Sequence, residues 1–128
     1  MTCVLPLVLL VEDDPDTAAL YRALLGSEGM EVVHCSDCGE AHRWWHTSLR
    51  RPDLVVMDVR LPDGNGLDLL AKLRAEPWTR DVPVVIISVT EKRHLAPSLG
   101  AVTWLTKPVD GDELRRTLNA YARRANPS

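Results

Sequence analysis

Cysteine is scarce in this 128-residue sequence, which contains three cysteines, an odd number. A small disulfide-stabilised scaffold needs paired cysteines, so we expect a reduced compartment and a core held by hydrophobic packing. Long hydrophobic runs are also lacking, because the apolar stretch 4–11 contains Pro6 and is too short to span a bilayer. It has neither the basic start nor the cleavage site of a signal peptide. We therefore predict a cytoplasmic protein without a membrane segment.

An excess of positive charge is missing as well. The sequence has 15 Lys and Arg against 18 Asp and Glu, which gives a formal net charge of −3. Direct nucleic-acid binding is therefore not expected, since it usually requires a basic face. Internal repeats, low-complexity tracts and linkers are also absent from the sequence. A chain of this length usually forms one domain, so we predict a single domain over residues 1–128.

What the sequence does contain is an alternation of short apolar runs with amphipathic segments. The runs are rich in β-branched residues and short enough to be buried strands. We place these strands at 7–11, 31–35, 54–57, 83–88 and 102–105. The segments between them carry helix signals, such as Asp14 followed by Pro15 and Asp110 followed by Glu113. Buried strands that alternate with helices predict an α/β fold whose parallel sheet is covered on both faces.

For two of the expected helices, the sequence also predicts the buried face or the length. The segment 38–49 should turn Ala41, one of the adjacent pair Trp44 and Trp45, Ser48 and Leu49 towards the core. Neighbouring helical positions lie about 100° apart, so both tryptophans cannot be fully buried. The segment 91–99 is interrupted by Pro97, so the fourth helix should be short or irregular.

Polar side chains follow four of the predicted strands. Glu12 and Asp13 come directly after the first strand, and Asp58 follows the third. Ser88 ends the fourth strand, and Lys107 lies just beyond the fifth. Because the carboxyl ends of parallel strands meet at one edge of a sheet, we expect these side chains to lie close together.

The chemistry of such a cluster favours a hard divalent cation. Two carboxylates about 4 Å apart repel each other by about 4 kcal/mol at an effective dielectric constant of about 20. The donors at this edge are oxygens, which favours Mg²⁺, or alternatively Mn²⁺, over Zn²⁺. Mg²⁺ uses only one or two carboxylates, so Asp58 stays available as a nucleophile towards phosphorus. Lys107 and the Ser88 hydroxyl would then contact the phosphoryl oxygens.

Several motifs occur along the chain in a definite order. They are Leu-Leu-Val-Glu-Asp-Asp at 9–14, Asp-x-x-x-Pro-x-x-x-Gly at 58–66, Ile-Ser at 87–88, Gly-Ala at 100–101 and Trp-Leu-Thr-Lys-Pro at 104–108. Together they resemble the receiver domain of response regulators in two-component signalling, and the likeness covers nearly the whole chain. The resemblance implies a flavodoxin-like, doubly wound sheet of five parallel strands in the order 2-1-3-4-5, flanked by five helices.

The resemblance also implies roles for individual residues. Asp58 would accept the phosphoryl group, Lys107 would bind it and Ser88 would act as the switch hydroxyl. Trp104 takes the position of the switch aromatic, where the family usually has Tyr, Phe or His. This bulkier side chain would either turn inward on phosphorylation or lie inward always. The Lys107–Pro108 peptide bond is expected to be cis.

The implied metal ligands come from the same edge. Asp13 and Asp58 would bind Mg²⁺ directly, Glu12 would contribute through water, and Arg60 would offer its backbone carbonyl. Arg60 and Thr90 also occupy the two variable positions that, in the family, tune loss of the phosphoryl group.

The predicted function is a phosphorylation-dependent signalling switch. A sensor histidine kinase or a histidine phosphotransfer protein would donate to Asp58, and the face formed by segment 91–99, strand 102–105 and the last helix would be remodelled for an output partner. Such a domain promotes its own phosphorylation and dephosphorylation and is not a turnover enzyme. One alternative is a pseudo-receiver that binds proteins without being phosphorylated. A phosphatase of the haloacid dehalogenase kind is disfavoured, because it needs a second aspartate where this chain has Arg60.

A second set of metal-binding residue types lies in the segment 34–46. It comprises His34, Cys35, Cys38, His42 and His46. Cys35-x-x-Cys38 has the spacing of a zinc ligand pair, and His42 and His46 are four residues apart on an expected helix. A second Cys-x-x-Cys pair is absent from the sequence. The favoured interpretation is therefore ordinary core and surface placement, with zinc binding as the alternative.

Overall fold

The computed structural model describes residues 5–125, with side chains up to Tyr121. Its main sheet contains five parallel strands in the order β2-β1-β3-β6-β7, which is the predicted order 2-1-3-4-5. The strands of this sheet are β1 (Leu7–Val11), β2 (Glu31–Cys35), β3 (Leu54–Asp58), β6 (Val84–Ser88) and β7 (Thr103–Thr106). A separate antiparallel hairpin, β4 (Arg60–Leu61) and β5 (Gly64–Asn65), follows β3 and was not predicted.

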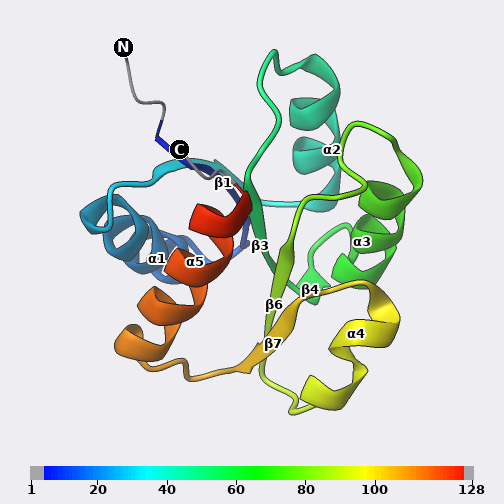
Figure 1. Cartoon of the computed structure of the whole chain (residues 1–128). Helices are drawn as coiled ribbons and strands as arrows, with labels where there is room; N and C mark the ends of the chain where they lie inside the picture. The colour runs from blue at the N-terminus through cyan, green and yellow to red at the C-terminus, as the bar shows by residue number, and fades with distance from the viewer. Residues whose placement is uncertain (1–4, 126–128) are drawn as a thin grey trace.

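The helices cover both faces of the sheet, as Figure 1 shows, with α1 and α5 on one side and α2, α3 and α4 on the other. They are α1 (Pro15–Ser27), α2 (Cys38–Thr47), α3 (Gly66–Ala75), α4 (Ala96–Leu99), which continues the 3₁₀ turn η1 (Arg93–Leu95), and α5 (Gly111–Ala125). The fourth helix is short, as predicted from Pro97. It ends at Gly100, whose φ of 83° is a left-handed conformation that glycine adopts without strain.

The core consists of two layers separated by the sheet. In β1, Leu9 and Val11 pack towards α2 and α3, whereas Val8 and Leu10 pack towards α1 and α5. Successive strand residues point to opposite faces, so a strand covered on both faces buries every side chain. All five residues of β1 and of β6 are indeed buried, and the continuous apolar runs in the sequence have this origin.

The helices α1 and α2 each bury a defined set of side chains, and in α2 this set differs from the prediction. In α1 the buried stripe is Ala18, Tyr21 and Leu25, while Leu20 on the same helix is 58% exposed. In α2 Trp45 is the buried tryptophan. The prediction for Leu49 was wrong: α2 ends at Thr47, Ser48 is in an extended conformation, and Leu49 is fully exposed.

Between residues 5 and 125, no helix is both long and apolar enough to cross a membrane.

Candidate functional site

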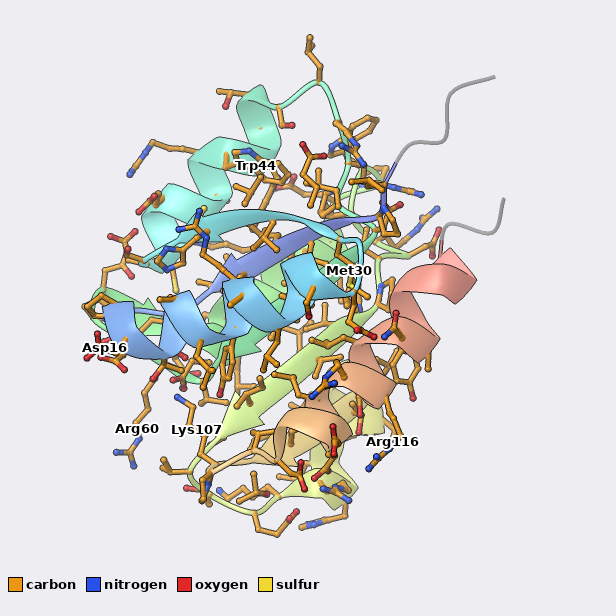
Figure 2. The ribbon with its side chains drawn as sticks, turned by 90° about the vertical axis from the view of Figure 1, so that its left-hand side faces the viewer. Asp16, Met30, Trp44, Arg60, Lys107 and Arg116 are labelled. Carbon is orange, nitrogen blue, oxygen red and sulfur yellow. The ribbon has the colours of Figure 1, made fainter. Side chains whose placement is uncertain are left out.

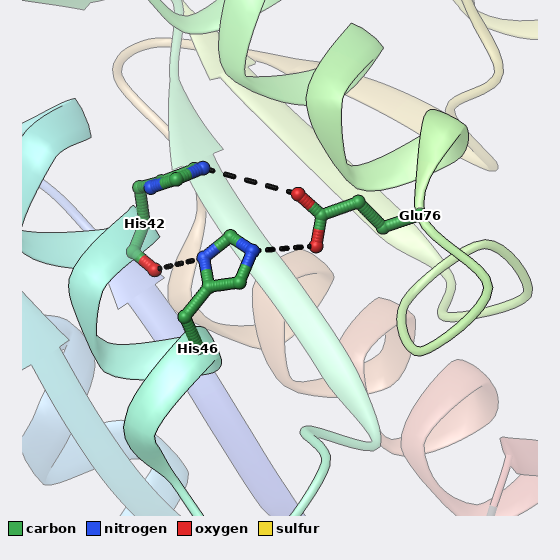
Figure 3. Close-up of side chains that lie close together, drawn as sticks. All are labelled: His42, His46 and Glu76. Carbon is green, nitrogen blue, oxygen red and sulfur yellow. Dashed lines mark hydrogen bonds and ion pairs between the residues drawn. The ribbon is translucent and has the colours of Figure 1, made fainter.

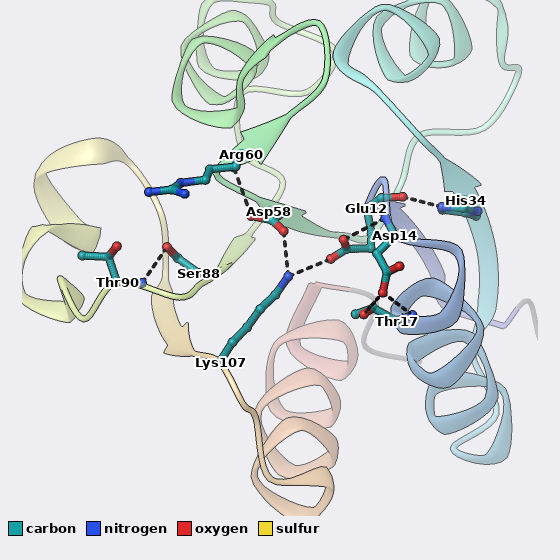
Figure 4. A network of polar contacts seen from close by, with 9 residues as sticks. All are labelled: Glu12, Asp14, Thr17, His34, Asp58, Arg60, Ser88, Thr90 and Lys107. Atoms are coloured by element: carbon teal, nitrogen blue, oxygen red, sulfur yellow. Dashed lines mark hydrogen bonds and ion pairs between the residues drawn. The ribbon is translucent and has the colours of Figure 1, made fainter.

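The carboxyl ends of β1, β3 and β7 bring a lysine between two carboxylates. The Nζ atom of Lys107 lies 2.7 Å from Oδ2 of Asp58 and 3.2 Å from Oε2 of Glu12 (Figure 4). The side chains are 22%, 12% and 3% exposed, respectively. Figure 2 shows Lys107 at the same end of the molecule as Asp16, in the first turn of α1. Residues from distant parts of the sequence therefore meet at the predicted edge.

For both Glu12 and Lys107, burial and neighbouring opposite charges shift the pKa in opposite directions. Burial is the largest influence on the pKa of Glu12 and raises it above its usual value, although the Asp14 amide and Lys107 lower it. For Lys107, burial is again the largest single influence and lowers the pKa, but the hydrogen bond and charge of Asp58, together with Glu12, raise it overall. Lys107 is therefore a stable cation at neutral pH.

A second property of this edge is its set of oxygen donors. Carboxylate oxygens of Glu12, Asp13 and Asp58 all lie within 4.8 Å of one another. Asp13 is exposed, whereas Glu12 is buried and accepts a hydrogen bond from the Asp14 amide at 3.2 Å. Three carboxylates at this spacing fit a hard divalent cation such as Mg²⁺, which prefers oxygen ligands and retains water. Lys107 supplies only one of the positive charges that such a cluster needs.

The loop after β3 holds the Asp58 carboxylate in place. The backbone amide of Arg60 donates to Oδ1 of Asp58 at 3.0 Å. The Arg60 side chain is exposed and points away from this carboxylate in Figure 4. The Gly66 amide, at the start of α3, donates to the Val59 carbonyl at 2.7 Å and closes the loop. Both carboxylate oxygens of Asp58 are thus hydrogen-bonded.

Ser88 and Trp104 are connected through Thr90. The Ser88 hydroxyl oxygen accepts a hydrogen bond from the Thr90 amide at 3.2 Å, and the Thr90 carbonyl accepts one from Nε1 of Trp104 at 2.8 Å. Trp104 is 2% exposed and belongs to the core layer beneath α4. The Lys107 amide donates to the Ser88 carbonyl at 2.7 Å, and the Lys107–Pro108 bond is cis, as predicted.

Sequence reasoning missed the position of His34. Nε2 of this residue lies 2.7 Å from the backbone carbonyl oxygen of Glu12. His34 sits on β2, next to β1 and in register with Leu10. The contact depends on the register between these two strands, which no motif in the sequence indicates. His34 therefore helps to position the main chain that carries the acidic residues.

The cysteines and histidines of the segment 34–46 do not form one group. Among the described residues, the clusters with metal-binding potential contain no cysteine. Burial raises the pKa of Cys35 to about 12, and burial together with Asp63 raises that of Cys38 to about 11. His42 and His46 instead meet Glu76, a residue that the sequence analysis did not include (Figure 3).

Comparisons with known proteins agree with the fold. The family described as "Response regulator receiver domain" matches residues 8–119. An uncharacterized 14.6 kDa protein of Leptolyngbya boryana is 35% identical over 117 residues, covering 89% of this chain and 88% of that protein. The phosphate regulon transcriptional regulatory protein PhoB of Klebsiella pneumoniae is 32% identical over 94% of this chain, which spans 53% of PhoB.

Solved structures add a magnesium-bound relative. The receiver domain of the sensor histidine kinase PA1611 from Pseudomonas aeruginosa PAO1 has a TM-score of 0.82 and 29% identity. The match covers 93% of this chain and 98% of that domain. That structure has a magnesium ion coordinated in its active site cleft.

Proposed function

Because this chain belongs to the response regulator receiver domain family of two-component signalling, we propose that it is a phosphorylation switch with Asp58 as the acceptor. The observation that carries the proposal is the 2.7 Å contact between Lys107 and Asp58 beside the Glu12 and Asp13 carboxylates. It combines a nucleophilic carboxylate, a cation and an oxygen-rich metal site at one edge of the sheet. We further propose that residues 1–128 act as one domain.

The chemical step is transfer of a phosphoryl group to a carboxylate oxygen. An oxygen of Asp58 forms a bond to phosphorus while the bond from phosphorus to the donor nitrogen breaks, and the imidazole of the donor keeps that electron pair. Asp13, Asp58 and the Arg60 carbonyl would hold Mg²⁺, with Glu12 acting through water. The ion supplies positive charge for the phosphoryl oxygens. Lys107 binds one phosphoryl oxygen, and its raised pKa keeps it charged for this role.

The response to phosphorylation starts at Ser88. Its hydroxyl donates to a phosphoryl oxygen, which displaces the 88–90 turn. Trp104 is hydrogen-bonded to the Thr90 carbonyl and already buried, so it moves together with this turn. We propose that the surface of α4, β7 and α5 changes in consequence and that an output partner reads it. Arg60 and Thr90, both exposed, tune the lifetime of the phosphoryl group.

The phosphoryl donor is a sensor histidine kinase or a histidine phosphotransfer protein in the cytoplasm. The similarity to PhoB, a transcriptional regulatory protein about twice as long, supports a role in a regulatory pathway. The acidic net charge of −3 favours protein partners over direct contact with nucleic acid or membranes. The domain is a signalling module that promotes its own phosphorylation and dephosphorylation and does not turn over substrate.

The test is intact-mass measurement after incubation with Mg²⁺ and acetyl phosphate, a small phosphoryl donor. We expect the native protein to gain one phosphoryl group and Asp58→Asn to gain none. Asp81→Asn, at an exposed aspartate outside the site, is the matched control and should behave as the native protein does. Chelation of Mg²⁺ should abolish the gain, and replacement by Mn²⁺ should preserve it.

The alternative function gives a different result. A pseudo-receiver would bind Mg²⁺ yet gain no mass with acetyl phosphate or with a phosphorylated histidine donor. A mass gain that persists in Asp58→Asn would also contradict the proposal, because the acceptor would then be another residue.

A further inference from the structure

Two histidines of α2 face a glutamate that follows α3 (Figure 3). Nε2 of His46 lies 2.9 Å from Oε2 of Glu76, and Nε2 of His42 lies 3.8 Å from Oε1. One ligand atom from each of the three residues lies within 4.8 Å of the others. Glu76 follows the end of α3, whereas Asp58 precedes its start, so this cluster is separate from the carboxylate site.

The hydrogen bonding of His46 directs one ring nitrogen at the glutamate. Nδ1 of His46 lies 2.9 Å from the backbone carbonyl oxygen of His42, an acceptor that requires a proton on Nδ1. In the neutral ring, Nε2 then carries a lone pair and faces the Glu76 carboxylate. A lone pair facing a carboxylate is stable only with a cation between them, either a second proton on the ring or a metal ion.

The separations within the cluster also suit a shared ion. Zinc binds histidine nitrogen and carboxylate oxygen at about 2.0–2.2 Å in tetrahedral geometry, which places neighbouring ligand atoms about 3.3–3.5 Å apart. The observed separations of 2.9 Å and 3.8 Å lie on either side of this value. The longer one exceeds a hydrogen bond, so proton sharing accounts for the contact of His46 but not for that of His42, whose ring packs against the Trp45 and His46 rings.

A buried neighbour fixes the glutamate. Nε1 of Trp45 donates to Oε2 of Glu76 at 3.1 Å, and Trp45 is 2% exposed. The Trp45 ring also contacts the His42 ring edge-on, with centroids 5.1 Å apart. Such outer contacts orient metal ligands and raise affinity. The side chains of His42, His46 and Glu76 remain 41%, 43% and 30% exposed, so an ion can reach them from solvent.

We propose that His42, His46 and Glu76 form a binding site for a divalent transition-metal ion, with Zn²⁺ as the physiological occupant and a fourth position open to water. Two imidazoles and one carboxylate are a ligand set that zinc uses in proteins when one position stays open. A bound ion would join α2 to the end of α3 on the face of the sheet that also carries α4. The site does not depend on phosphorylation of Asp58.

The test is a competition titration of the full chain with Zn²⁺ and a chromophoric chelator, in excess Mg²⁺ to saturate the carboxylate site. We expect one equivalent of Zn²⁺ to bind the native protein. Affinity should fall at least tenfold in His46→Gln and in Glu76→Gln, which retains an oxygen for the Trp45 N–H. His94→Gln, at an exposed histidine of η1, is the matched control and should bind as the native protein does.

Two further measurements make the result decisive. Cys38→Ser should retain full Zn²⁺ affinity, and a loss there would overturn the proposal in favour of a thiol ligand. Thermal unfolding should show that Zn²⁺ raises the Tm of the native protein and of His94→Gln but not that of His46→Gln. Equal Zn²⁺ affinity in the native protein and in both site variants would also overturn the proposal, leaving the cluster as an ion pair between α2 and α3.

Discussion

Gly66 packs directly against the main chain of Asp58, because a Cβ atom at position 66 would overlap the Asp58 carbonyl oxygen. The same Gly66 Cβ would also approach the Val59 Cα atom at 3.1 Å. The first residue of α3 therefore fits closely beneath the loop that holds the proposed acceptor. This contact gives a physical reason for glycine at the end of the Asp-x-x-x-Pro-x-x-x-Gly motif.

Replacement of this glycine should disturb both the fold and the site. We expect Gly66→Ala to lower the free energy of unfolding by about 1–3 kcal/mol, the usual cost of overpacking, and to slow phosphorylation of Asp58. Gly64→Ala is the matched control, since its Cβ would meet only the Cys38 Sγ atom at 3.9 Å. Urea unfolding of both variants checks the prediction, and equal unfolding midpoints would contradict it.

Lys107 should stabilise the fold by compensating the buried carboxylate of Glu12. We expect Lys107→Met to lower the free energy of unfolding at pH 7 by about 1–3 kcal/mol in the presence of a chelator. Lys107 lowers the pKa of Glu12, so its removal raises that pKa further. The folded variant then takes up a proton more readily than the unfolded chain does.

Because protonation of Glu12 is linked to folding, the loss of stability in Lys107→Met depends on pH. The deficit of Lys107→Met should be largest at pH 7 and should shrink as the pH falls towards the ordinary Glu12 pKa of 4.5. Urea unfolding at pH 5 and pH 7 measures this difference. Lys92→Met, at an exposed lysine, should change stability by less than about 0.5 kcal/mol at either pH. A deficit that is independent of pH would argue against Glu12 as the group involved.

Trp104 should contribute to stability through both its volume and its indole N–H. We expect Trp104→Phe to lower the free energy of unfolding by about 1–3 kcal/mol, since the Thr90 carbonyl loses its partner and the core loses volume. Trp78→Phe is the control, because Trp78 is 47% exposed, and it should have little effect. If the two variants unfold at the same urea concentration, Trp104 does not have this role.

The thiol of Cys38 should react slowly at mildly alkaline pH. Its pKa is raised from 9.0 to about 11, so at pH 8 the thiolate fraction is about 100-fold smaller than in the unfolded chain. We expect alkylation by iodoacetamide, followed for the Cys38 peptide by mass spectrometry, to be slowed accordingly in the folded protein. The rate should keep rising with pH up to about 11. A plateau near pH 9 would show that the folded environment leaves the thiol unperturbed.

Much of the fold was predictable because buried parallel strands leave a simple pattern. The strands β1 and β6 are covered on both faces, so their sequences are continuous apolar runs. The meeting of Asp58 and Lys107 was predictable for a related reason, since both lie at the carboxyl ends of strands in one parallel sheet. Topology alone brings such residues to one edge.

The features that could not be predicted depend on contacts between distant residues, which leave no local pattern in the sequence. The β4–β5 hairpin has only two residues in each strand, too few for an alternation to be visible. The contact of His34 with Glu12 needs the register between β1 and β2. The approach of Glu76 to His46 needs the packing of α2 against α3, which is set by side chains such as Trp45.

The fluorescence of two buried tryptophans can report on the two proposed sites. Trp45 and Trp104 lie in the same core layer, but their N–H groups bond to different acceptors, the carboxylate of Glu76 and the carbonyl of Thr90. An event at Asp58 should therefore perturb the emission of Trp104, and an ion at Glu76 that of Trp45. Two single-tryptophan variants, one that keeps only Trp45 and one that keeps only Trp104, with phenylalanine at the other positions, would give each site its own intrinsic fluorophore. Communication between α2 and β7 then becomes directly measurable.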